Sequence, residues 1–96
     1  MIVEISVIPI GVGESLSSFI AEIIKIIERR NLKYQLTSMG TILEIKDYDE
    51  LCTLLKEFDS ALFSKGLRRN YYVLKIDSRI KKSSIEYKVK SVLEKL

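Results

Sequence analysis

One carboxylate interrupts an apolar stretch of this chain and is the clearest candidate for chemistry. Glu44 lies in residues 41–46, just after a turn at Met39 and Gly40, with Leu43 and Ile45 on either side. Alternation along a strand puts Glu44 on the face opposite these two neighbours. Burial of an unpaired carboxylate is costly, so we expect Glu44 to meet water, a counter-charge, a hydrogen-bond donor or a ligand.

A second carboxylate, Glu4, is expected on a neighbouring strand and on the same face as Glu44. Two close carboxylates can share a proton or a cation. The alternative is structural: Lys46, Lys75 or Arg69, or their symmetry mates, pair with the two acids inside a dimer interface.

The other residue types of the chain argue against catalysis. The chain has no histidine, and its single cysteine, Cys52, excludes a disulfide framework and a cysteine-rich metal site. Gly11 and Gly13 precede a predicted helix, but the phosphate-loop lysine and a third glycine are missing. This turn is either a generic anion nest or an ordinary connection. We therefore expect no enzyme, no cofactor and no metal site.

Hydrophobic periodicity predicts seven elements that position these side chains. Strands are predicted at 2–9, 33–38, 41–46 and 69–77. Helices are predicted from a Ser15 cap to Arg30, from an Asp47 cap to about Gly66, and from Ser83 to the end of the chain.

This order predicts one α+β domain over residues 1–96, a ferredoxin-like βαββαβ sandwich. Its antiparallel sheet has the strand order 4-1-3-2, two helices cover one face, and a C-terminal helix follows. The opposite face mixes apolar and charged residues, and such an exposed patch is large for a monomer. We expect two chains to pack these faces together about 10 Å apart.

Charge is distributed unevenly. Residues 1–64 hold six Lys/Arg and ten Asp/Glu, whereas residues 65–96 hold ten and three, so the net charges are −4 and +7. The basic C-terminal third is either a solvated surface or a docking surface for an acidic partner or nucleic acid. Of these two partners, nucleic acid is the less expected. Neither a membrane-spanning segment nor a signal peptide is expected, which predicts a cytoplasmic protein, and the composition favours a thermophile.

Five short segments occur here in a characteristic order and spacing: residues 7–11, 15–17, 32–36, 39–44 (Met-Gly-Thr-x-x-Glu) and 75–79 (Lys-Ile-Asp-x-Arg). Together they resemble the small thiamine-binding protein family, whose members are single ferredoxin-like domains. The resemblance implies a non-catalytic protein that binds thiamine or its hydroxymethylpyrimidine moiety. It also implies a homodimer or homotetramer that acts as a carrier, a sensor or a salvage accessory.

The resemblance also implies a set of ligand-binding residues: Ser17, Tyr34, Met39, Thr41, Glu44 and Arg79. In this interpretation Glu44 balances the charge of the thiazolium ring of thiamine or accepts from the pyrimidine amino group. The hydroxyl groups of Ser17 and Thr41 bind the edge of the pyrimidine ring. The structural alternatives are a capping Ser17, a hairpin-stabilising Thr41, a core Tyr34 and an Arg79 paired with Asp77. The chain departs from the family pattern at Asn31, Ser38 and Ile45.

Overall fold

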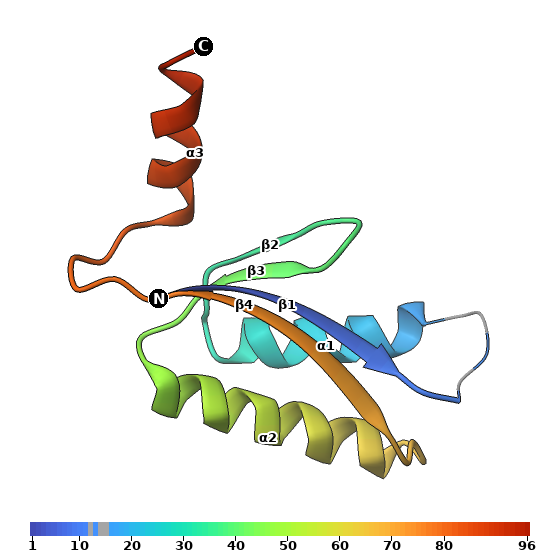
Figure 1. Cartoon of the computed structure of the whole chain (residues 1–96). Coiled ribbons are helices and arrows are strands. Elements are labelled where there is room, and N and C mark those ends of the chain that lie inside the picture. The colour runs from blue at the N-terminus through green and yellow to red at the C-terminus, as the bar shows by residue number, and fades with distance from the viewer. Residues whose placement is uncertain (12, 14–15) are drawn as a thin grey trace.

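The structure, a computed structural model, describes residues 1–11, 13 and 16–96. Its elements are β1 (Ile2–Pro9), α1 (Ser17–Arg29), β2 (Tyr34–Leu36), β3 (Thr41–Glu44), α2 (Tyr48–Ser64), β4 (Asn70–Asp77) and α3 (Ile85–Leu93) (Figure 1). The predicted order is confirmed, although β2 and β3 are shorter than predicted. The predicted Ser15 cap lies outside the described residues.

The four strands form one antiparallel sheet in the order β2-β3-β1-β4, so the predicted ferredoxin-like topology is confirmed. β1 pairs with β4 along its whole length, from Ile2 opposite Asp77 to Pro9 opposite Asn70. Its pairing with β3 ends earlier, at Ile5 opposite Thr41. Residues 6–9 of β1 therefore run on past β3 and have no paired strand on that side among the described residues.

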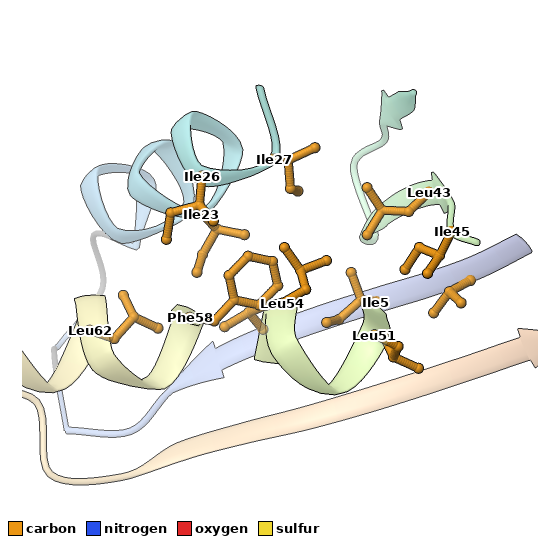
Figure 2. Close-up of a cluster of buried hydrophobic side chains, with 12 residues drawn as sticks. Ile5, Ile23, Ile26, Ile27, Leu43, Ile45, Leu51, Leu54, Phe58 and Leu62 are labelled. Atoms are coloured by element: carbon orange, nitrogen blue, oxygen red, sulfur yellow. The ribbon is translucent and has the colours of Figure 1, made fainter. Parts of the chain in front are cut away.

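Helices α1 and α2 cover one face of the sheet and enclose the core (Figure 2). Apolar residues three and four apart on each helix face the alternate inward residues of the strands. The buried cluster consists of Val3, Ile5, Val7, Ile23, Ile26, Ile27, Leu43, Ile45, Leu51, Leu54, Phe58 and Leu62. The other side of the sheet carries no helix layer, and we call it the open face: Ile2, Glu4, Ser6, Ile8, Ile42, Glu44, Tyr71, Val73, Lys75 and Asp77.

Side-chain caps fix where two of the helices begin. The Asp47 carboxylate accepts from the Glu50 amide at 2.9 Å, and the Glu50 carboxylate accepts from the Lys46 amide at 2.9 Å. Asp47 is therefore the predicted cap of α2, and Glu50 adds a capping-box-like bond to the amide of the residue before the cap. The predicted cap of the last helix was wrong by one residue. Ser84, not Ser83, caps α3, because its hydroxyl accepts from the Tyr87 amide, three residues on, at 3.0 Å.

The turn after α1 requires an unusual backbone conformation. Asn31 has a φ of 54°, the left-handed region that glycine adopts without strain. Asparagine tolerates this region better than most residues, which suits it to this turn. The chain then continues into β2 at Tyr34.

Helix α3 stands apart from the body, on the side of the sheet opposite α1 and α2 (Figure 1). The molecule is accordingly elongated, with extents of 46 × 29 × 21 Å. Within the described residues, no helix combines the length and the apolar character that crossing a membrane requires.

Candidate ligand-binding site

A hollow of about 410 Å³ lies between β1, the start of α1 and the β2–β3 hairpin. Small-molecule sites commonly fall between about 300 and 1,000 Å³, so this volume suits a single aromatic ring with substituents. The hollow is lined by Ile5, Ser6, Val7, Ile8, Leu16, Ile20, Ile23, Leu36, Thr37, Ser38, Met39, Gly40 and Thr41. Most of these side chains are apolar, and no acidic residue is among them.

The hollow lies where β1 extends beyond the end of β3. Alternate residues of a strand point their main-chain groups to the same side, and Met1 exchanges both of its bonds with Ile45, so the odd residues of β1 face β3. Beyond the end of β3, the Val7 N–H and C=O and the Pro9 C=O therefore lack a partner strand and are available to another molecule. The hollow thus combines an apolar lining with one main-chain donor and two main-chain acceptors.

The hairpin that forms the other wall is held by its own hydroxyl groups. Thr37 Oγ1 donates to the Gly40 carbonyl at 2.8 Å and accepts from the amides of Met39 and Gly40 at 3.2 and 3.1 Å. Ser6 Oγ donates across the hollow to the Met39 carbonyl at 2.9 Å. These contacts fix the hairpin against β1 and keep the wall in place.

Gly40 permits this close approach of hairpin and strand. A Cβ atom at this position would lie 3.0 Å from the Ile5 carbonyl oxygen and 3.0 Å from Ser6 Oγ. Such distances are shorter than ordinary van der Waals contacts, so any larger residue would push the hairpin away from β1.

The structure brings two of the six predicted ligand-binding residues into the hollow. Thr41 is buried, with 5% of its surface exposed, and Met39 is 81% exposed at the rim. Ser17 is exposed at the first position of α1, next to the lining residue Leu16. Tyr34 lies outside the lining, and its hydroxyl donates to Glu28 Oε1 at 2.7 Å. This hydrogen bond raises the pKa of the Tyr34 phenol.

Glu44 is remote from the hollow and contacts other parts of its own chain. Its Oε1 accepts from the Ile85 main-chain N–H at 2.6 Å and lies 3.8 Å from Lys33 Nζ. An N–H group and a counter-charge therefore meet this carboxylate. The N–H belongs to α3, and Lys33 in turn pairs with Glu86 of that helix. Any contact of Glu44 with a ligand stays a prediction.

Glu4, the second predicted acid, pairs with Lys75 at 3.7 Å. This is one of the structural pairings that the sequence allowed. The register places Glu4 opposite Ile42 and Glu44 opposite Ile2, so the two acids are not directly opposite each other. Arg79 lines a different hollow of about 660 Å³ under the β4–α3 connection, with Ile80, Lys81, Lys82, Ser83, Ser84 and Tyr87. Although larger, that hollow is formed mostly by exposed connection residues. Asp77 pairs with Lys88 rather than with Arg79.

Two ion pairs beside Glu44 fasten the start of α3. Lys33 Nζ donates to Glu86 Oε2 at 2.5 Å, which raises the pKa of Lys33 and lowers that of Glu86. Lys88 donates to Asp77, and this bond lowers the pKa of the Asp77 carboxyl. All four groups are exposed to solvent, so salt screens these interactions.

The sequence reading missed several residues of the hollow, notably Ser6, Ile8 and Leu36. Alternation along the strand predicts only that Ser6 and Ile8 lie on its mixed face. The difference in length between β1 and β3 was the available signal, because a longer central strand leaves an unpaired edge. Of the departures from the family pattern, Ser38 lines the hollow, whereas Ile45 is buried in the core.

Comparison with known proteins identifies the family. A sequence model of the thiamine-binding protein family matches residues 3–93. This chain belongs to that family. A relative named UPF0045 protein, from Methanothermobacter thermautotrophicus, is 39% identical over 95 residues, which cover 97% of this chain and 96% of the relative.

Solved structures of similar proteins share the fold. A hypothetical protein from Methanocaldococcus jannaschii matches with a TM-score of 0.83 at 36% identity, covering 97% of this chain and 95% of that one. A protein from Thermotoga maritima, whose description names thiamine biosynthesis or salvage, matches with a TM-score of 0.78 at 25% identity. That match covers 95% of this chain and 96% of the other.

Proposed function

We propose that this member of the thiamine-binding protein family binds thiamine or its hydroxymethylpyrimidine moiety without catalysing a reaction. The ligand's pyrimidine ring occupies the hollow between β1, α1 and the β2–β3 hairpin. One observation carries the proposal: the unpaired edge of β1 borders a mostly apolar hollow of about 410 Å³.

The chemistry of an aminopyrimidine suits such a hollow. The ring offers an amino donor beside ring-nitrogen acceptors, and the free edge of β1 offers the Val7 N–H donor beside the Val7 and Pro9 carbonyl acceptors. The flat faces of the ring pack against the apolar side chains of Ile8, Leu36 and Met39. The Ser6 and Thr41 hydroxyl groups supply further polar contacts at the ring edge.

The thiazolium half of thiamine contributes less in this arrangement. No acidic residue is among the described lining residues, so none of these supplies a carboxylate to balance the cation. We therefore expect the free pyrimidine to bind at least as well, per atom, as whole thiamine. This expectation separates the hollow from a site built around Glu44, which would favour the cation.

A binding role without chemistry agrees with the residues at hand. No pair of a general base and a nucleophile lines the described part of the hollow, which has hydroxyl groups but no histidine, cysteine or acid. We propose that the protein works as a carrier, a sensor or a salvage accessory. We also propose that it is a homo-oligomer, because Tyr71 and Val73 leave 53% and 46% of their surfaces exposed on the open face.

Calorimetric titration with hydroxymethylpyrimidine, thiamine and the free thiazole half tests the proposal. We expect heat from the first two ligands and none from the third. Leu36→Arg, which fills the hollow, should weaken binding at least about tenfold, a loss of about 1.4 kcal/mol. Gln35→Arg is the matched control, because Gln35 is exposed on the same strand and does not line the hollow.

Two results would count against the proposal. One is the absence of heat with every ligand at millimolar concentration. The other is an equal loss of binding in the Leu36 and Gln35 variants, which would show that added positive charge, and not the hollow, weakens the ligand.

A further inference from the structure

The hydroxyl groups beside the β2–β3 hairpin already use their protons within the protein. Thr37 Oγ1 accepts from two amides of the turn and donates to the Gly40 carbonyl. A hydroxyl group has one proton and two acceptor positions, so the Thr37 hydroxyl is fully used. Ser6 Oγ donates to the Met39 carbonyl at 2.9 Å. Neither hydroxyl therefore has a proton to spare for a ligand in the hollow.

The bond from Ser6 takes the place of the next bond of the sheet. The β1–β3 register ends with Ile5 opposite Thr41, and the same spacing would bring Val7 opposite Met39. Ile5 and Val7 direct their main-chain groups to the same side, so a continued ladder would join the Val7 N–H to the Met39 carbonyl. The described residues do not form that bond, and the Ser6 hydroxyl occupies the carbonyl instead.

The polar groups left free at the end of β1 are mostly acceptors. The Val7 N–H is a donor, whereas the Val7 carbonyl, the Pro9 carbonyl and the lone pairs of Ser6 Oγ are acceptors. The hydroxyl groups of Ser38 and Thr41 can donate or accept, so they favour neither kind of ligand. No lysine or arginine is among the described lining residues to add further donors. The hollow therefore suits a ligand that has several N–H protons beside one acceptor.

We propose that Ser6 is a specificity-determining residue of the hollow, through which an aminopyrimidine is selected over the oxopyrimidine of the same shape. By holding the Met39 carbonyl, Ser6 keeps the Val7 N–H free to donate to a ring nitrogen. The neighbouring acceptors then receive the two protons of the ligand's amino group. This inference rests on the proposed function, because it concerns the ligand chemistry of the same site.

The oxo compound meets the same groups less well. An aminopyrimidine has two protons on its exocyclic nitrogen and an unprotonated ring nitrogen beside it. In the oxopyrimidine the exocyclic atom is an acceptor, and the neighbouring ring nitrogen carries a proton. In the same orientation, its oxygen would face the acceptors of β1, and its ring N–H would face the Val7 N–H. Polar groups that lose their hydrogen bonds on binding are costly, which is a strong basis for discrimination between similar ligands.

Three variants test the role of Ser6. Ser6→Ala removes the hydroxyl group, and Ser6→Thr keeps it on a side chain that suits a strand. Ser60→Ala is the matched control, because Ser60 is exposed on α2 and does not line the hollow. Circular dichroism checks that each variant keeps the fold.

Without ligand, hydrogen exchange at the Val7 amide measures whether the ladder has been extended. We expect weak protection in the unmodified chain, in Ser6→Thr and in Ser60→Ala, because the described residues offer this amide no acceptor. In Ser6→Ala the Met39 carbonyl becomes free to accept from the Val7 N–H, so the protection factor of Val7 should rise at least about tenfold. An unchanged protection factor in Ser6→Ala overturns the proposal.

With ligand, calorimetry compares hydroxymethylpyrimidine with its oxo counterpart, in which a carbonyl oxygen replaces the amino group. The unmodified chain, Ser6→Thr and Ser60→Ala should bind the amino compound at least about tenfold more tightly than the oxo compound. In Ser6→Ala the affinity for the amino compound should fall at least about tenfold, and the preference should disappear. Equal affinities in the unmodified chain, or an unchanged preference in Ser6→Ala, overturn the proposal.

The same titrations separate this inference from the proposed function. Heat from both compounds without a preference contradicts the inference alone, because the hollow would still bind a pyrimidine. Absence of heat with either compound contradicts the proposed function, and the selectivity fails with it, whatever the exchange at Val7 shows.

Discussion

Removal of the Glu44 carboxylate should loosen α3 and leave the body of the protein folded. Glu44 Oε1 accepts from the Ile85 N–H at 2.6 Å and lies 3.8 Å from Lys33 Nζ. Its side chain is 27% exposed, so the hydrogen bond is only partly shielded from water. The first turn of α3 depends on this acceptor, because no other group in the described part of the chain accepts from the Ile85 amide.

The size of the effect follows from the type of hydrogen bond. A bond to a charged acceptor contributes about 1.5–3 kcal/mol, and a bond between neutral groups about 0.5–1.5 kcal/mol. Glu44→Gln keeps a neutral acceptor and should cost about 1 kcal/mol. Glu44→Ala leaves the N–H without a partner and should cost about 2 kcal/mol.

Hydrogen exchange at the Ile85 amide measures this cost directly. When exchange requires local opening, a loss of about 1 kcal/mol speeds it about fivefold, and a loss of about 2 kcal/mol about thirtyfold. Core amides such as that of Leu54 should be unaffected, because they open only with the whole domain. Glu4→Gln is the control, since it removes an equal charge from the same face, where Glu4 pairs with Lys75 and with no part of α3 among the described residues.

Unchanged exchange at Ile85 in Glu44→Ala would refute this reasoning. Glu44 would then not stabilise the start of α3, and a contact with a ligand would become the better explanation of its position on β3. An equal acceleration in Glu4→Gln would also refute it, because a general effect of charge would replace the specific contact.

Three further predictions concern the ion pairs of α3, the β2–β3 hairpin and the turn after α1. The pKa values of Asp77 and Glu86 are lowered from their ordinary 3.8 and 4.5, and that of Lys33 is raised from 10.5, so α3 should be held best between about pH 4.5 and 10.5. The protection factor of the Ile85 amide, which corrects for the pH dependence of intrinsic exchange, should fall as the pH drops below this range, and a constant protection factor there would contradict the prediction. Gly40→Ala should cost about 1–2 kcal/mol in urea unfolding, because its Cβ would crowd the Ile5 carbonyl, and an unchanged midpoint would show that the hairpin yields freely. Asn31→Val should cost about 1–2 kcal/mol and Asn31→Gly much less, since φ is 54° there; equal losses in the two variants would argue against backbone strain.

The sequence predicted the fold well because several local signals agreed. Alternation marked β1 and β4, helical spacing marked the stripes of α1 and α2, and Asp47 with Glu50 marked where α2 begins. The strand order then followed from two right-handed crossovers joined by a hairpin. The short β2 and β3 were overestimated, because residues next to a strand can continue its alternation without pairing.

The candidate site was harder to predict, because it depends on where pairing stops. Nothing in residues 6–9 of β1 shows that β3 ends opposite Ile5. Thr41 and Glu44 belong to one motif, yet they lie on opposite faces of β3, Thr41 on the core side and Glu44 on the open side. The partner of Glu44 came from α3, 41 residues along the chain, which no local pattern indicates.

Amide chemical shifts during titration with hydroxymethylpyrimidine test the central claim most directly. The account predicts that the largest changes occur at Ser6, Val7 and Ile8 on the unpaired edge of β1, with smaller ones across the hairpin at 37–41. Changes confined to the surroundings of Glu44 and Arg79, with the β1 edge silent, would contradict it.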